Sequence, residues 1–573
     1  MIKAALYTLC LLFPMIATLS GCAAPPVRSD AVQPQPAPSA LRSEGAAFHY
    51  SLGVLLAMNG NLEQAIREME EAGRLDPASP YLAKEIASLY MEKGEPGKAL
   101  AICKKNIEAH PNDIDTLLLI GDIFMHLKDY QSAAEQYQRV IDLDPNNTSA
   151  RFYLGTAQVE LKQLEKAIAT FKDLLRRDPN HFMTNYYLAK ILADQQRYDE
   201  AETAFKKTLA LRPDFEAAMI DLARLYERQK KISQAIEVYR TMIEVIPGRP
   251  LARIRLGELF LEQKRYDEAE EAFREVLTLD PANRDVRLTL GLIALERGEY
   301  EKAIDIIAAL VKEYPTEYRL VYLLGAAYDE AKADAKALET LRGIPSGGGE
   351  QFANAQIRIA IILKRQKRVN EAIDSLLAAI RVKKDTPGIY VYLASLYEEG
   401  KQFAAAEAIL REGLQTTPES VDLYYGLGVL FEKTGRFEES IAAMKTVLKF
   451  DPDHADALNF IGYLYADRDI HLDEAERMIK KALSLKPGNG YMMDSLGWVY
   501  FRQDRLDEAI RWLKEASEAL PEDPAIIEHL GDVYVRKGQI PEAVESYERA
   551  IRFNPESEPL KKKLDDLIRK KSP

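Results

Sequence analysis

A proline recurs every 34 residues over much of this chain, and this period limits the possible folds more than any other feature. The residue before a proline avoids the helical region, so each of these prolines ends a helix. A fixed period of this length is typical of proteins built from stacked repeats. The first series has steps of 34, and a second series follows after a slip of one residue, with one more slip at Pro487; the prolines are Pro77, Pro111, Pro145, Pro179, Pro213, Pro247, Pro281 and Pro315, then Pro418, Pro452, Pro487, Pro521 and Pro555.

Residues 250–283 show the repeating unit clearly. The pattern predicts two helices joined by a short polar turn at 264–266. Asp267, with Glu270 three residues later, predicts a capped start for the second helix. The first helix carries one apolar face, and the second carries apolar residues at i, i+3, i+4, i+7 and i+8, typical of an amphipathic helix; these residues are Leu256, Leu259 and Phe260, then Ala269, Ala272, Phe273, Val276 and Leu277.

Small residues occupy one position of the first helix in every unit. Twelve residues later, or thirteen in the unit of Gly462, alanine follows in fourteen units and Ser440 in the other. Small residues at both positions predict that the two helices of a unit cross closely. The fifteen residues at the first position are Gly53, Ala87, Gly121, Gly155, Ala189, Ala223, Gly257, Gly291, Gly325, Ala360, Ala394, Gly428, Gly462, Gly497 and Gly531.

In order along the chain, the unit carries Leu-Gly, then an aromatic residue, then Ala, then Phe or Tyr, and then Pro, with a period of 34 residues. This unit resembles the tetratricopeptide repeat. The resemblance covers about 46–557 and implies an all-α superhelical solenoid of about fifteen helix-turn-helix units. The expected order is repeats 1–9 at 46–345, a Gly-rich loop at 346–352 and repeats 10–15 at 353–557. The loop is either a hinge or an irregular turn without a mechanical role. A capping helix and tail are expected at 558–573, with one apolar stripe; its residues are Leu560, Leu564, Leu567 and Ile568.

The first residues are expected to lie outside the repeat fold. Lys3 and the apolar stretch 4–18 are typical of a signal peptide over 1–21. The run Leu-Ser-Gly-Cys ending at Cys22 resembles a bacterial lipobox, which implies lipid attachment at Cys22; an ordinary secretory signal with a chance cysteine is the alternative. Residues 22–45 are then a Pro-rich tether. In Gram-negative lipoproteins an aspartate directly after the lipidated cysteine usually keeps the protein at the inner membrane, and here that residue is Ala23. The chain therefore resembles an outer-membrane lipoprotein and is expected to face the periplasm.

The sequence contains no pattern that predicts catalysis. None of its seven histidines forms a pair at helical spacing or a cluster with cysteines, and no phosphate loop or nucleophile elbow is found. We therefore expect no enzyme, no metal site and no cofactor. The net charge of −13 also argues against nucleic acid as a partner, because such binding needs a clustered basic surface.

Protein binding is the positive expectation. In tetratricopeptide arrays the second, fifth, ninth, twelfth and thirteenth residues of the first helices line a concave groove. A row of aromatic residues flanked by acids would fit an extended peptide or a helix that carries apolar and basic residues. Trp and Tyr are also favoured interface anchors, although Trp498 could instead pack as core. The resemblance implies these groove residues: Tyr463, Asp467, Tyr491, Asp494, Trp498, Phe501 and Glu528, followed by Asp532.

Residues 454–550 are also similar to the C-terminal repeats of Gram-negative outer-membrane lipoproteins. The runs ADR at 466–468 and DSLGWVY at 494–500 carry this resemblance. One member of that group is the binding partner of a carboxy-terminal processing protease and brings it together with cell-wall hydrolases. The resemblance implies an adaptor of this kind. The alternative is a structural lipoprotein of an envelope export machine for polysaccharide or pili.

Overall fold

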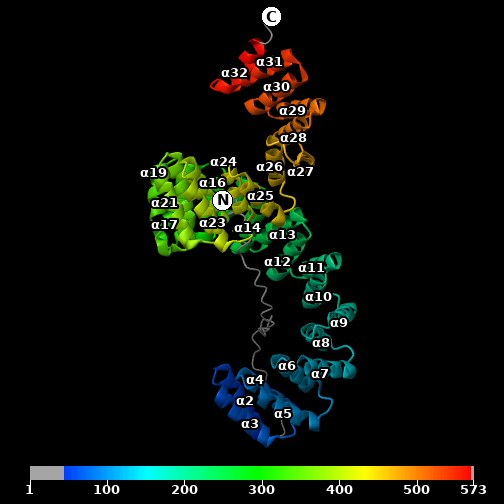
Figure 1. Ribbon diagram of the computed structural model, residues 1–573. Helices are drawn as coiled ribbons and strands as arrows, with labels where there is room; N and C mark the ends of the chain where they lie inside the picture. The colour runs from blue at the N-terminus through cyan, green and yellow to red at the C-terminus, as the bar shows by residue number, and fades with distance from the viewer. Residues whose placement is uncertain (1–43, 570–573) are drawn as a thin grey trace. The chain divides into compact units, whose positions relative to one another are not determined.

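The computed structural model describes residues 44–569, and in this range it consists of 31 α-helices and one short 3-10 turn, with no strand. The predicted all-α array of about fifteen helix pairs is therefore confirmed (Figure 1). The chain divides into two compact parts, one up to Glu296 and the other from Arg297. None of the helices in 44–569 is long and apolar enough to cross a membrane.

The N-terminal part contains the first fifteen of these helices, most of them 13 or 14 residues long. They are α2 (Glu44–Met58), α3 (Leu62–Leu75), α4 (Pro80–Glu92), α5 (Pro96–Ala109), α6 (Ile114–His126), α7 (Tyr130–Leu143), α8 (Thr148–Glu160), α9 (Leu164–Arg177), α10 (Phe182–Asp194), α11 (Tyr198–Leu211), α12 (Glu216–Arg228), α13 (Ile232–Val245), α14 (Pro250–Glu262), α15 (Tyr266–Leu279) and α16 (Arg284–Glu296).

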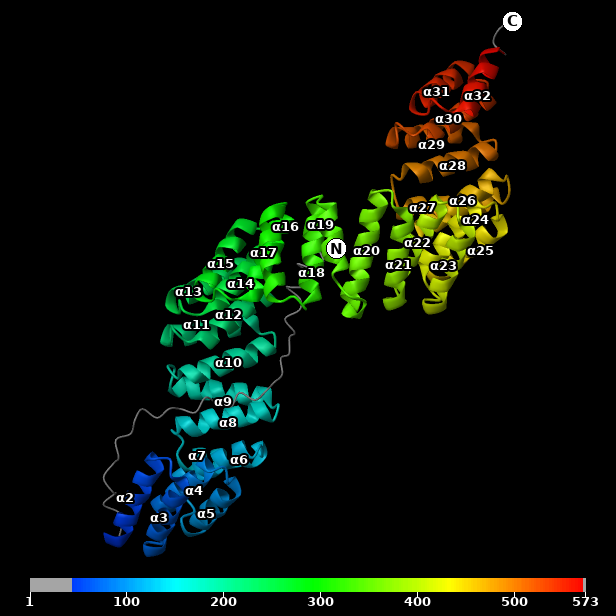
Figure 2. The same ribbon diagram turned by 90° about the vertical axis from the view of Figure 1, so that its left-hand side faces the viewer.

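The C-terminal part contains the other helices and the 3-10 turn η1 (Figure 2). They are α17 (Tyr300–Glu313), α18 (Tyr318–Glu330), α19 (Asp334–Arg342), η1 (Ser346–Gly348), α20 (Glu350–Arg365), α21 (Val369–Val382), α22 (Pro387–Glu399), α23 (Phe403–Thr416), α24 (Val421–Lys433), α25 (Phe437–Phe450), α26 (Ala455–Asp467), α27 (Leu472–Leu485), α28 (Gly490–Arg502), α29 (Leu506–Ala519), α30 (Pro524–Lys537), α31 (Ile540–Phe553) and α32 (Glu558–Arg569).

The small residues of the first helices lie where the two helices of a unit cross, as predicted. A Cβ added to Gly257 would lie 2.7 Å from Cζ of Phe273, so the ring occupies the space of the missing side chain. Ser440, the exception at the second small position, is fully buried and donates its hydroxyl to the Gly428 carbonyl at 2.7 Å. The hydroxyl is thus tolerated because it has a hydrogen-bond partner.

The turn between the two helices differs from the sequence prediction in one respect. α15 begins at Tyr266, and no side chain caps it, so the predicted capping by Asp267 is wrong. Lys264 adopts a left-handed conformation with φ of 58°, and this reverses the chain before the helix begins. Asp267 instead lies in the first turn, where its charge favours the helix dipole.

The described residues cover the ends of the array only in part. α2 is described from Glu44, the first described residue, to Met58. In α32, Leu560 and Leu567 are buried as expected, but Ile568 is 45% exposed. The last residues of the predicted tail and the segments before 44 lie outside the described residues.

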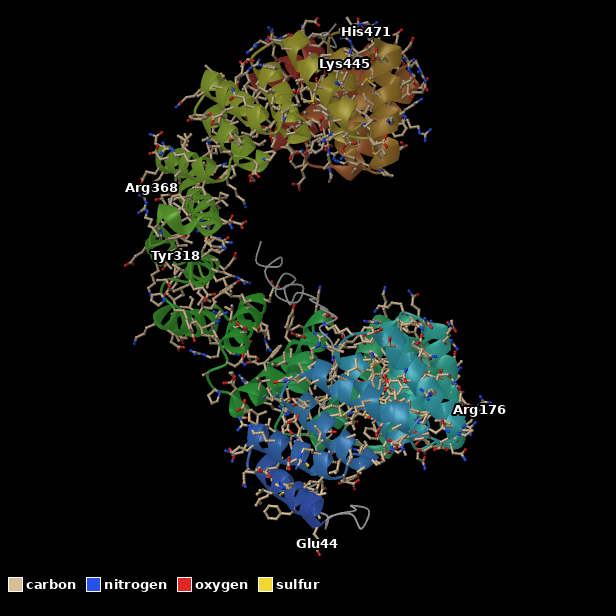
Figure 3. All side chains as sticks on the ribbon, turned by 90° about the horizontal axis from the view of Figure 1, so that it is seen from below. Glu44, Arg176, Tyr318, Arg368, Lys445 and His471 are labelled. Atoms are coloured by element: carbon tan, nitrogen blue, oxygen red, sulfur yellow. The ribbon has the colours of Figure 1, made fainter. Side chains whose placement is uncertain are left out.

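The predicted loop at 346–352 is shorter in the structure, because α20 already begins at Glu350. Ile344 is 1% exposed, and a Cβ on Gly348 would lie 3.2 Å from the ring of Tyr318, which is labelled in Figure 3. Across the loop, Arg358 of α20 forms an ion pair with Asp329 of α18 at 2.8 Å. Rotation at this loop would have to break these buried contacts, and a hinge there stays a prediction.

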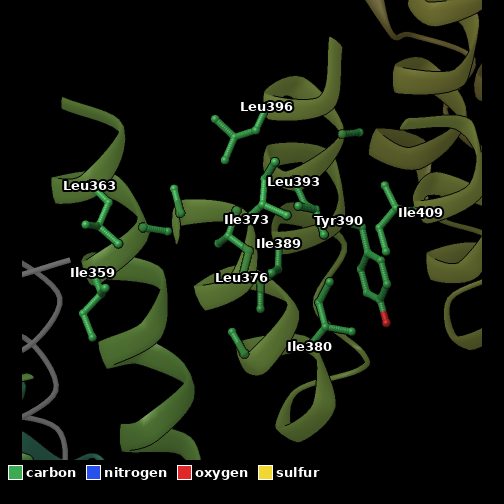
Figure 4. Close-up of a cluster of buried hydrophobic side chains, with 14 of the residues drawn as sticks. Ile359, Leu363, Ile373, Leu376, Ile380, Ile389, Tyr390, Leu393, Leu396 and Ile409 are labelled. Carbon is green, nitrogen blue, oxygen red and sulfur yellow. The ribbon is translucent and has the colours of Figure 1, made fainter. Parts of the chain in front are cut away.

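Each part is stabilised by apolar side chains buried between neighbouring helices and has no single centre. Figure 4 shows one such cluster, in which side chains of α20, α21, α22 and α23 meet. Ile359, Leu376 and Tyr390 are almost completely buried there. This arrangement is expected when every repeat buries its apolar face on its neighbours.

Candidate functional site

The seven predicted groove residues lie on α26, α28 and α30 of the C-terminal part, and we call them the aromatic–acid face. Amphipathic first helices place them at repeating positions, away from the small residues that contact the second helices. The aromatic–acid face comprises Tyr463, Asp467, Tyr491, Asp494, Trp498, Phe501 and Glu528.

Trp498 is the centre of an aromatic cluster on this face. The centroid of its ring lies 4.3 Å from the centroid of the His529 ring, and the two planes are nearly parallel, at 26°. The centroid of the Phe501 ring lies 4.8 Å away. Trp498 and Phe501 are half-buried and pack against the core of the C-terminal part. The indole Nε1 is buried without a hydrogen-bond partner. Trp498 therefore contributes to packing while part of its ring remains accessible.

Asp494 holds His529 in place. Nδ1 of His529 lies 2.8 Å from Oδ1 of Asp494, and the two side chains are only 18% and 11% exposed. Burial opposes the charged form of His529, but the Asp494 hydrogen bond, together with the carboxylates of Asp532 and Glu528, raises its pKa above the ordinary value. Compared with a free imidazole, His529 is thus stabilised in its protonated form.

Tyr463 and Asp467 form the second cluster of the face. Burial, followed by the nearby carboxylates of Asp467, Asp494 and Glu432, raises the pKa of Tyr463 to about 12. Asp467 is exposed. A phenol ring surrounded by carboxylates favours a cation, because the ring face and the acids attract positive charge together.

Glu528 and Asp532 are already paired within the chain. Nζ of Lys563, on α32, lies 2.8 Å from Oε1 of Glu528 and 2.7 Å from Oδ2 of Asp532. Tyr547 also donates its hydroxyl to Asp532 at 2.6 Å. These acids therefore differ from Asp467, since their charge is compensated by the C-terminal helix. Tyr491 is 59% exposed and lies at the start of α28.

Sequence reasoning missed His529, which it treated as one isolated histidine among seven. Asp494 and His529 are 35 residues apart, one repeat plus one residue. The same separation joins Tyr186 to Asp221 at 2.9 Å in the N-terminal part. Polar residues 35 positions apart could therefore have been predicted to form hydrogen bonds, because the first helices of successive units lie side by side.

Among residues 44–569, no group of three or more His, Cys, Asp or Glu side chains could hold a metal ion. Cys103 is fully buried, and burial raises the pKa of its thiol. Cys22, the predicted lipid attachment site, lies outside the described residues.

Models of the tetratricopeptide repeat match most of the chain. One of them matches more than half of it, at residues 124–191, 192–254, 228–274, 260–318, 396–462 and 471–528. Two others, one described as a TPR repeat, match 39–80, 84–148 and 357–421, and 531–558.

Individual proteins and structures are only distantly similar. A TPR repeat-containing protein of Pseudomonas aeruginosa is 29% identical over 184 residues, which are 32% of this chain and 31% of that protein. This chain thus spans less than a third of that relative's length.

Two solved structures are further examples. The C-terminal part of a TPR repeat-containing protein from Cytophaga hutchinsonii is 21% identical, covers 41% of this chain and 97% of that chain, and has a TM-score of 0.37. YrrB, described as a TPR protein with an unusual peptide-binding site, is 20% identical, covers 32% of this chain and 95% of that chain, and has a TM-score of 0.28. The repeat models, which cover more than half of the sequence, and the helical array agree: the chain belongs to the tetratricopeptide repeat family.

Proposed function

We propose that this protein is a non-catalytic scaffold whose aromatic–acid face binds a partner protein through an extended peptide or a helix. The observation that carries the proposal is the Trp498 cluster, in which a half-buried indole is held between His529 and Phe501 beside carboxylates. Preorganised aromatic side chains lose little entropy on binding and are the commonest anchors of protein interfaces. Tetratricopeptide repeats bind proteins or peptides, and the proposal follows that property of the family.

The charges on the face suggest which chemistry the partner carries. Lys563 already compensates Glu528, and His529 compensates Asp494, whereas Asp467 is exposed beside Tyr463. We therefore place a basic residue of the partner at Asp467 and an apolar residue against Trp498.

The proposed location is the periplasmic side of the outer membrane, with the lipid at Cys22 as the anchor. This rests on the lipobox-like run and on the similarity of 454–550 to outer-membrane lipoproteins. The same similarity supports an adaptor that brings a carboxy-terminal processing protease together with cell-wall hydrolases. An export machine for polysaccharide or pili is the alternative setting for such a scaffold.

Capture of crosslinked partners on intact membranes tests the proposal, and the chain offers a matched control. Trp512, the second of its two tryptophans, is also half-buried but lies on α29, a second helix. Trp498→Ala should lose the captured partner, and Trp512→Ala should keep it. Equal capture by both variants would refute the assignment of the face.

The identity of the captured proteins tests the setting separately. A protease recovered with cell-wall hydrolases supports the adaptor, and a porin or a synthase complex supports the export machine. If the native protein captures other partners, and Trp498→Ala loses them, the binding face is supported and both settings are rejected.

A further inference from the structure

The outer face of α2 is apolar and exposed. Phe48 and Met58 are each 63% exposed and Leu55 is 56% exposed, and these side chains lie along one stripe with Ser51. The opposite side of the helix packs on α3, where Tyr50 is buried. Large apolar side chains that cluster on one exposed face mark an interaction surface.

The last described helix has a different character. A solenoid needs a polar outer face at each end to stay soluble. α32 meets this need, because Lys562, Asp565 and Asp566 are exposed. α2 contains no lysine or arginine, and its one acidic residue, Glu44, lies at its first position. The outer face of α2 therefore lacks the polar cover that α32 has.

The charges of α2 and α3 limit which kind of partner can bind the exposed face of α2. An anionic lipid surface attracts amphipathic helices through lysines and arginines, which α2 lacks. The adjoining α3 adds no net positive charge, because its four acids outnumber its two arginines; these residues are Glu63, Glu68, Glu70 and Glu71, with Arg67 and Arg74. The whole chain has a net charge of −13, so two copies meet most easily at a face that brings no like charges together. An uncharged face avoids that repulsion and suits a second copy of this chain.

The spacing of the stripe also fits a twofold pair. Phe48 and Met58 lie at equal distances from Gly53 along the helix, and so do Ser51 and Leu55. In a twofold dimer each surface meets its own copy, so antiparallel helices centred near Gly53 would place Phe48 against Met58 of the partner subunit. A thioether against an aromatic ring is a favourable contact. We propose that two copies of this protein pair through antiparallel α2 helices.

Disulfide trapping in cells tests this arrangement in the full-length chain. Two differently tagged copies are expressed together, one with Phe48→Cys and the other with Met58→Cys. The antiparallel pair should give a disulfide that joins the two tags. Two copies of Phe48→Cys should not crosslink, because their Cα atoms would be about 15 Å apart. Absence of the mixed disulfide, or an equal yield from Phe48→Cys alone, would overturn the proposal.

The mass of the purified full-length protein in nonionic detergent gives a second readout. Light scattering should show a dimer that Phe48→Glu with Leu55→Glu converts to a monomer with an unchanged helical spectrum. Leu279→Glu is the matched control, since Leu279 is 44% exposed on α15, and this variant should stay dimeric. If the double variant keeps the dimer mass, this face does not join the two copies and the proposal fails.

Discussion

Truncation of Trp498 separates a binding anchor from a core residue. Trp→Ala in a packed core costs about 3–5 kcal/mol. Trp498 is half-buried, which reduces this to about 2 kcal/mol by the same scale. Its Nε1 is buried without an acceptor, and removal of such a donor returns about 1–3 kcal/mol. We therefore expect Trp498→Ala to lower the free energy of unfolding by at most about 1 kcal/mol.

The effect on binding should be larger. A central aromatic anchor commonly contributes more than ~2 kcal/mol, which is about a thirtyfold loss of affinity. Trp498→Phe is the matched variant, because it keeps a ring against His529 and Phe501 and removes the unpaired donor. The stability of Trp498→Phe should equal or exceed that of the native protein. Its affinity for the partner should lie between the affinities of the native protein and of Trp498→Ala.

Local stability has to be measured, since long repeat arrays do not unfold in one step. Hydrogen exchange of the α28 and α30 amides reports it, and titration of the captured partner reports affinity. The reasoning is refuted if Trp498→Ala lowers the protection of α28 by about 3 kcal/mol or more while affinity is unchanged, because that is the result for a core residue.

Three further predictions address the charge, the packing and the anchor. The pKa of His529 is raised above the ordinary 6.5, so its protonation stabilises the folded state fully below pH 6.5, and this contribution is lost as the pH rises through the folded-state pKa; the hydrogen-exchange stability of α30 in His529→Gln should depend less on pH over that range than in the native protein, and an equal pH dependence would contradict the role of Asp494. Gly257→Leu should cost about 1–3 kcal/mol of the local stability that hydrogen exchange reports for α14 and α15, because any Cβ there meets the ring of Phe273; unchanged protection would contradict the close crossing of these helices. Cys22→Ser should move the protein from the membrane fraction to the soluble fraction or leave the precursor uncut, and unchanged fractionation with unchanged mass would exclude the lipid anchor.

Local chemistry determined most of the fold in advance. A proline ends most of the second helices, and glycine or alanine allows each close crossing, so the helices and their pairing follow from residues within one unit. Gly257 and Phe273 are 16 residues apart and meet for this reason. The exceptions were turns: Lys264 adopts the left-handed conformation, which lysine rarely does, and the signal lay in other units, where glycines such as Gly298 occupy the same position.

The candidate site depended on contacts between units, and there the sequence determined less. It placed Trp498, Asp494 and Glu528 on one series of helix positions. Only the tertiary structure decided that His529 stacks on the indole and that Lys563 compensates Glu528. Both contacts join residues about one repeat apart, so they depend on how far each unit is rotated against the next. That rotation is set by the packing of all the side chains between the units, which no single position in the sequence specifies.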